Sequence, residues 1–258
     1  MAIFNFFKSK TLSESKIAKL VKTATDPYVA SEDRDDALER LAESGSDAAI
    51  RGMLQRFTMN ATGHIADETE KKWVEDRLVS IGESALPELR RYIDAGRRLT
   101  YALRAFQRIA GRDRTVAMCL EVLERLGPED HRNSDGKAQL VQHIAEEITE
   151  DSLNRLLPFL ADHSDDIRWL VLSVLEACKP ETVTPAQRIS IAEALAQALS
   201  DSQTGPRIHL RTAEVAAHGE WQMPGTLQAL SADVEGAFYL DKKHYVRRST
   251  ASNSSLRG

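Results

Sequence analysis

Apolar residues recur at three- and four-residue intervals along almost the whole chain, the spacing that places them on one face of an α-helix. No convincing stretch shows the alternation of apolar and polar residues that is typical of a half-buried strand. The pattern therefore predicts an all-α protein. The expected helices form six pairs: 13–25 with 31–44, 47–57 with 67–82, 84–95 with 97–111, 114–126 with 134–148, 151–161 with 164–178, and 185–200 with 205–218.

The predicted helix pairs form a repeated unit. Their second helices begin on average about 35 residues apart, near Ser31, Asp67, Arg97, Asp135, Ser164 and Gly205. Because one helix pair cannot bury its own apolar face, repetition at this period indicates a stack in which each pair covers its neighbours. The sequence therefore predicts a curved, right-handed stack of about six helix pairs, an α-α superhelix.

The two ends of the chain differ from the repeats. Residues 1–12 contain an apolar cluster (Ile3, Phe4, Phe6 and Phe7) that we expect to cover the first pair, with shallow contact to a membrane surface as the alternative. Residues 13–240 are the predicted repeat domain, whose last apolar positions, Leu227, Leu230, Val234 and Phe238, have helical spacing. Residues 241–258 are basic and rich in serine, which predicts a disordered tail.

Three segments resemble a known repeat. Residues 165–168 (Asp-Asp-Ile-Arg) follow residues 156–160 (Leu-Leu-Pro-Phe-Leu), an order that resembles a HEAT repeat, whose second helix commonly opens with an acidic turn and an arginine. Residues 78–89 (Leu-Val-Ser-Ile-Gly-Glu-Ser-Ala-Leu-Pro-Glu-Leu) are similar to the short bacterial variant found in phycobilin lyase-like proteins, and residues 34–45 match it in part. The resemblance spans roughly residues 13–218. It implies a HEAT-like solenoid whose second helices line the concave side.

Composition is ordinary for a soluble globular protein. The chain has 258 residues, of which 42% are hydrophobic and 28% charged, and its formal net charge is −5. No uncharged apolar run is long enough for a membrane span, and the N-terminus does not have the pattern of a secretory signal. The only cysteines, Cys119 and Cys178, fall in apolar helical patterns and indicate core thiols in a reducing compartment. We therefore expect a cytoplasmic protein.

The charge is unevenly distributed along the chain. Residues 90–114 carry a net charge of +6, whereas residues 26–47 and 121–166 carry −6 and −8. On a helical wheel, one stripe of the predicted helix 97–111 contains Arg97, Tyr101, Arg104 and Arg108. Arginine binds carboxylates in a bidentate manner, so the stripe predicts a surface for an acidic protein segment. The alternative interpretation is a solvated helix face paired with neighbouring acids.

A long, nearly uncharged connection lies inside the second pair, at residues 57–68. Long loops in repeat proteins often carry function, so Asn60 and His64 are candidate partner-binding residues. In the alternative interpretation Asp67 caps the next helix and His64 is simply a polar loop residue. A metal site is not expected, because nothing else in the sequence supplies the helical Glu-x-x-His or cysteine pairs that would complete one.

These patterns predict a non-enzymatic scaffold or adaptor that binds another protein and needs no cofactor. The sequence contains no glycine-rich phosphate loop, no Gly-x-Ser-x-Gly and no Cys-x-x-Cys. The alternative is an enzyme on a HEAT-like fold, similar to bilin lyases or to glycosylases that excise alkylated bases. Arg168-Trp169 resembles part of a glycosylase groove, but Trp169 is read more easily as a core residue, and an acidic repeat domain disfavours nucleic acid. Membrane contact is expected only as a weak peripheral contact through either end.

Overall fold

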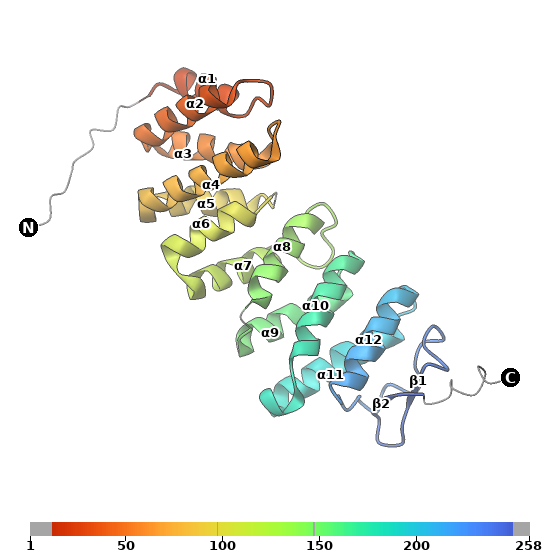
Figure 1. The fold of residues 1–258 in the computed structure, drawn as a ribbon. Helices are drawn as coiled ribbons and strands as arrows, with labels where there is room; N and C mark the ends of the chain where they lie inside the picture. The colour runs from red at the N-terminus through yellow and green to blue at the C-terminus, as the bar shows by residue number, and fades with distance from the viewer. Residues whose placement is uncertain (1–11, 97, 147, 250–258) are drawn as a thin grey trace, which may run out of the picture. The chain divides into compact units, whose positions relative to one another are not determined.

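The computed structural model describes residues 12–249 except residues 97 and 147 (Figure 1). Arg97, most of the apolar segment 1–12 and the last part of the predicted tail therefore lie outside the described residues. The described chain is mostly helical and has almost no sheet, which confirms the all-α prediction. It divides into two compact units, residues 1–118 and residues 119–258, here called the N-terminal and C-terminal units.

The N-terminal unit is built from packed helix pairs. Its helices are α1 (Glu14–Ala24), α2 (Ser31–Ser44), α3 (Asp47–Leu54), α4 (His64–Ile81), α5 (Leu86–Asp94) and α6 (Thr100–Ala110), with 3-10 turns at Gln55–Thr58 and Gly82–Ala85. Helix α7 (Arg112–Leu126) crosses the boundary between the units. The second helices α2, α4 and α6 contact one another in order, and so do the first helices α1, α3 and α5. Each apolar face is thereby covered by a neighbouring pair.

The C-terminal unit continues the pattern with α8 (Ser134–Ala145), α9 (Glu150–Leu156), α10 (Asp165–Ala177), α11 (Pro185–Ser200) and α12 (Pro206–His218). A 3-10 turn follows α9 at Leu157–Ala161, and another lies at Pro180–Thr182. Helix α10 contacts both α8 and α12. The helices begin and end within three residues of the predicted ranges, except that α9 ends at Leu156 and the rest of the predicted range 151–161 is a 3-10 turn.

Local signals explain several of the helix ends. Gly45 follows α2 with φ of 59°, a left-handed conformation that glycine adopts without strain from a Cβ atom. The hydroxyl of Thr184 accepts a hydrogen bond from the backbone N–H of Gln187, and the Gln187 side chain accepts one from the backbone of Thr184. This capping box starts α11.

The C-terminal end of the described chain differs from the sequence prediction. The apolar positions Leu227, Leu230, Val234 and Phe238 are buried, but they lie in irregular backbone, a turn and strand β1 (Phe238–Leu240) rather than in a helix. Strand β1 pairs antiparallel with β2 (Val246–Arg248). Strand β2 lies inside residues 241–258, the segment that was predicted to be a disordered tail.

A local turn and one buried side chain explain why residues 241–249 are folded despite their basic composition. The carboxylate of Asp241 accepts hydrogen bonds from the backbone N–H groups of Lys243 and Tyr245, which closes the turn between the strands. The Val246 side chain is fully buried. The prediction of disorder rested on the basic residues of this segment. The buried side chain of Val246 and the turn at Asp241 determine its local fold instead.

Candidate functional site

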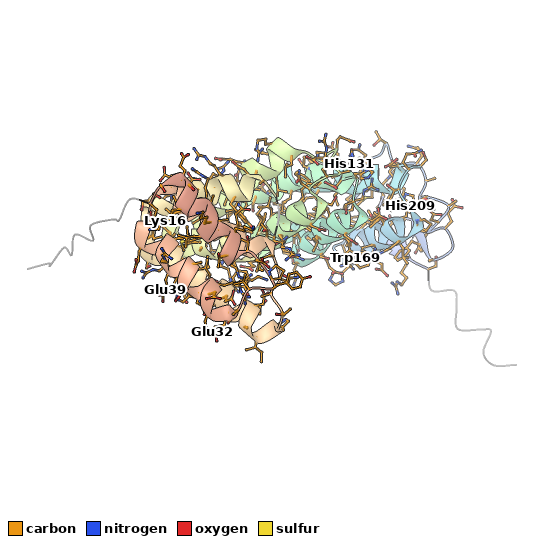
Figure 2. All side chains as sticks on the ribbon, turned by 90° about the horizontal axis from the view of Figure 1, so that it is seen from above. Lys16, Glu32, Glu39, His131, Trp169 and His209 are labelled. Atoms are coloured by element: carbon orange, nitrogen blue, oxygen red, sulfur yellow. The ribbon has the colours of Figure 1, made fainter. Side chains whose placement is uncertain are left out.

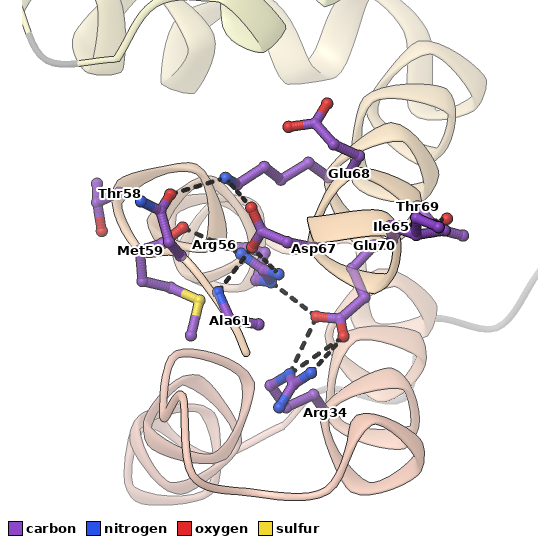
Figure 3. A network of polar contacts seen from close by, with 12 residues as sticks. Arg34, Arg56, Thr58, Met59, Ala61, Ile65, Asp67, Glu68, Thr69 and Glu70 are labelled. Atoms are coloured by element: carbon purple, nitrogen blue, oxygen red, sulfur yellow. Dashed lines mark hydrogen bonds and ion pairs between the residues drawn. The ribbon is translucent and has the colours of Figure 1, made fainter. Parts of the chain in front are cut away.

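A buried network of charged side chains lies beneath the segment that precedes α4 (Figure 3). The guanidinium of Arg56 donates to Glu70 at 2.8 Å and to Asp67 at 2.7 Å. Arg34, on α2, donates from Nε to the same Glu70 carboxylate at 3.0 Å, and Lys71 forms an ion pair with Asp67. All five side chains are buried. Buried charges remain ionised only when each is paired and hydrogen-bonded, and this network meets that condition.

The pKa values follow from these contacts. Burial raises the pKa of Asp67, but the backbone N–H of Ala61 together with Lys71 and Arg56 outweighs it and lowers the pKa to about 2. Burial also raises the pKa of Glu70, and the hydrogen bonds from Arg34 and Arg56 lower it below its usual value. Both carboxylates are therefore held in the charged form.

The network fixes the connection that was expected to be a long loop. Asp67 accepts a hydrogen bond from the N–H of Ala61 at 2.8 Å, and Asn60 accepts from Lys71 at 3.1 Å. Helix α4 already begins at His64, so the segment without helix is shorter than predicted. The expectation that Asp67 caps this helix is wrong, because Gly63 is the N-cap residue and the Asp67 carboxylate is buried among three donors.

Asn60 joins this segment to the chain just before α6. Its side-chain oxygen also accepts a hydrogen bond from Nη1 of Arg98 at 2.7 Å. Arg98 has φ of 48°, in the left-handed region that favours glycine. The structure thus connects Asn60 to the arginine-rich segment, whereas His64 is an exposed residue at the start of α4.

Tyr101 lies between aromatic, acidic and basic groups. Its ring stacks on Phe57 with centroids 5.4 Å apart, and the guanidinium of Arg104 lies 4.6 Å from its centroid. Its hydroxyl donates to Glu68 on α4. Burial is the main cause that raises the pKa of Tyr101, and the contact with Glu68 adds to it, so that the pKa is about 12. The phenol is consequently a neutral hydrogen-bonding group at physiological pH.

The two described arginines of the predicted stripe share one buried carboxylate on α4. Nη2 of Arg104 lies 2.9 Å from Oε2 of Glu75, and Nη1 of Arg108 donates to Oε1 of Glu75 at 2.8 Å. Arg108 also pairs with Asp76. The Glu75 side chain is 3% exposed, whereas those of Arg104 and Arg108 are 48% and 43% exposed. The stripe is paired with neighbouring acids, as the alternative interpretation expected, and its arginines also remain half open to solvent.

Sequence reasoning placed Tyr101, Arg104 and Arg108 on one stripe but missed their partners Glu68 and Glu75. A signal was present, because Glu68 precedes Tyr101 by 33 residues and Glu75 precedes Arg108 by 33 residues. This separation is close to the repeat period, so each pair occupies equivalent positions on successive second helices. We name the surface formed by Asn60, Glu68, Lys72, Glu75, Asp76, Arg98, Tyr101, Arg104 and Arg108 the α4–α6 face.

Trp169, on α10, differs from the prediction that it is a core residue (Figure 2). It is half-buried, and the guanidiniums of Arg207 and Arg211 lie 4.8 Å and 5.0 Å from its ring centroid. Arg207 and Arg211 come from the next second helix, α12. The ring therefore stabilises the contact between two successive second helices through cation–π interactions.

A serine, a histidine and an aspartate meet at the C-terminal end of the same unit. Nδ1 of His209 lies 2.6 Å from Asp233 and 3.1 Å from the Ser231 hydroxyl, while Nε2 lies 3.1 Å from the backbone oxygen of Asp201. In a catalytic triad the serine and the aspartate contact opposite ring nitrogens. Here both contact Nδ1, so the cluster has the composition of a triad without its geometry.

Neither a metal site nor a membrane-spanning helix is found among the described residues. They contain no group of three or more His, Cys, Asp or Glu side chains that could hold a metal ion. No helix among them has the length and apolar character needed to cross a membrane. Comparisons of the chain with protein-family models, with curated proteins and with solved structures found no significant match.

Proposed function

We propose that this protein is a non-enzymatic interaction module whose α4–α6 face binds an acidic segment of a protein partner. One observation carries the proposal: Arg104 and Arg108 are held side by side on the buried carboxylate of Glu75 while about half of each side chain stays exposed. A guanidinium has several N–H donors in a fixed plane. Pairing with Glu75 uses part of this capacity and orients the rest.

The orientation of these arginines matters more than the total charge. The exposed bases of the face are Lys72, Arg98, Arg104 and Arg108, and its acids are Glu68, Glu75 and Asp76, so its net charge is +1. This small excess gives only weak long-range attraction. Side chains that are already ordered lose less conformational entropy when a ligand binds, which favours recognition of a carboxylate. Tyr101 adds a flat ring beside the two guanidiniums.

The proposal also covers the arrangement of the repeats and the compartment. We assign the helix pairs to a right-handed, HEAT-like superhelix with the second helices on the binding side. Support comes from side-chain contacts at similar separations, 36 residues for Arg34–Glu70 and 35 for Glu176–Arg211, each joining successive second helices inside one unit. The proposed compartment is the cytoplasm, because Cys119 and Cys178 are thiols that are not joined in a disulfide.

The direct test is binding of a fluorescently labelled hexaglutamate peptide to the full chain, measured by anisotropy. We expect the Arg104→Gln/Arg108→Gln double variant to weaken binding about tenfold. The matched control is Arg77→Gln/Arg132→Gln, which removes the same charge from two exposed positions outside the face and should change affinity less than about twofold.

Two results would contradict the proposal. One is binding of hexaglutamate no tighter than that of a neutral Gly-Ser peptide. The other is an equal loss in both double variants, which would show an effect of net charge rather than of the α4–α6 face. If the peptide test succeeds, affinity capture from the source cell with the same two double variants identifies the natural partner.

A further inference from the structure

The C-terminal unit contains a pocket of about 680 Å³ that lies far along the chain from the α4–α6 face. Its wall is formed by α8 and α10 together with the segments that precede α9 and α11. Apolar side chains make up much of the lining, among them Val141, Ile148, Leu153, Leu170, Val174 and Val183. A hydrophobic pocket of this size, open to solvent, has the properties of a small-molecule site, for which roughly 300–1,000 Å³ is typical.

The hydroxyls around the pocket are already used by the protein. Ser173 donates to the backbone oxygen of Trp169, and Thr182 donates to that of Lys179. The hydroxyls of Thr149 and Thr184 belong to the capping boxes of α9 and α11. Because these donors are occupied, they offer a ligand few new hydrogen bonds.

The charge of the lining is also low. Glu146 is the only charged residue among the described residues that line the pocket. The remaining ionisable group is Cys178, and burial raises the pKa of its thiol, which keeps it uncharged. An anionic ligand would lose its hydration without gaining an opposite charge, and a cationic ligand would meet only Glu146, which already interacts with another group of the protein. An uncharged apolar ligand loses no comparable hydration.

We propose that this pocket binds an uncharged, largely apolar small molecule about the size of two to four rings. The size follows from the volume, because an apolar cavity of about 150 Å³ already holds benzene. The chemistry follows from the occupied hydroxyls and the uncharged thiol. The proposal does not depend on the α4–α6 face and can fail or succeed independently of it.

The test uses the full chain and N-phenyl-1-naphthylamine, an uncharged three-ring dye that fluoresces in apolar surroundings. We expect saturable binding of one dye per chain. Ala177→Trp, which places an indole at the pocket, should weaken binding about tenfold, whereas Ala117→Trp should leave it unchanged. Both alanines are exposed helix residues, and Ala177 is the one that lines the pocket. Thermal unfolding of both variants checks that each is folded.

Cys178 supplies a second readout at the site itself. Saturating dye should slow the reaction of the Cys178 thiol with a disulfide reagent about fivefold or more, because the thiol lies in the pocket wall. Cys119 is fully buried and provides little background. Non-saturable dye binding, an equal effect of both tryptophan variants, or an unprotected Cys178 would overturn the proposal. Displacement of the dye by a capped Leu-Phe-Leu peptide at lower concentration than by unlabelled polycyclic compounds would also overturn it in favour of a peptide groove.

Discussion

Arg108 donates a hydrogen bond to Glu75 at 2.8 Å although 33 residues separate them in the sequence. The contact joins successive second helices and leaves the arginine partly exposed while its partner is buried. A single carboxylate thus determines where two guanidiniums of the α4–α6 face lie, because Arg104 pairs with the same group.

This relationship predicts the effect of Glu75→Gln. The substitution removes one negative charge and so raises the net charge of the face by one. A purely electrostatic surface would therefore bind hexaglutamate more tightly. We expect binding about fivefold weaker instead, because the arginines lose the charge that orders them. Glu83→Gln is the control, since it adds the same charge at an exposed pair with Arg114. Anisotropy titrations on both variants decide between the two effects, and tighter binding by the Glu75 variant would contradict positioning.

Acid should destabilise the N-terminal unit through Asp67. Its pKa in the folded protein is about 2, below the usual value of 3.8, so its contribution is fully present above pH 4 and is lost as the pH falls toward 2. The shift corresponds to a contribution of about 2 kcal/mol. We expect Asp67→Asn to unfold more easily at pH 7 by about this amount, with a difference that narrows below pH 4. Urea unfolding across this pH range measures it, and a pH-independent difference would refute the assignment.

The C-terminal unit should depend strongly on the ion pair between Lys137 and Asp162, whose side chains are fully buried with their charged atoms 2.6 Å apart. Lys137→Met leaves a buried carboxylate without its partner and should lower the free energy of unfolding by about 3–5 kcal/mol. The double variant Lys137→Met/Asp162→Asn removes both charges, keeps an acceptor for the Ser164 N–H, and should recover much of this loss.

The pH dependence gives a second check on the same pair. Burial raises the pKa of Asp162 even beside Lys137, and removing the lysine raises it further. A carboxyl with a raised pKa in the folded state loses stability as the pH increases, so the deficit of Lys137→Met should grow between pH 4 and pH 7. Chemical denaturation at several pH values tests this, and a constant deficit would argue against a buried uncompensated carboxylate.

Residues 241–249 should behave as part of the folded unit. Val246 is fully buried, so Val246→Ala removes apolar contacts and should lower the free energy of unfolding by about 2 kcal/mol. Lys242→Ala, at an exposed position in the same segment, should change it by less than about 0.5 kcal/mol. Equal stability of the two variants in denaturant would show that the hairpin does not contribute to the fold.

The sequence predictions were accurate where a feature depends on neighbouring residues and less accurate where it depends on residues distant in the sequence. The ranges of the paired helices were correct to within three residues, apart from the end of α9, because apolar spacing and turn residues act within one helix. The tertiary structure gives Arg168 a structural role, because it donates hydrogen bonds to the backbone oxygen of Asp162 and to Thr204. Trp169 was assigned to the core because its sequence neighbours are apolar, but the residues that contact its ring are arginines of another helix.

By itself, the sequence determined that the protein is helical, that its helices come in pairs with a period of about 35 residues, and that arginines gather on one stripe. These properties depend on the order of neighbouring residues. Only the tertiary structure decided that Glu75 neutralises part of that stripe, that residues 241–249 fold, and that α8 and α10 enclose a pocket. The neutralised stripe and the pocket depend on side chains that are distant in the sequence and that packing brings within contact distance. Residues 241–249 depend on a local turn and also on the burial of Val246, in a strand that contacts α12.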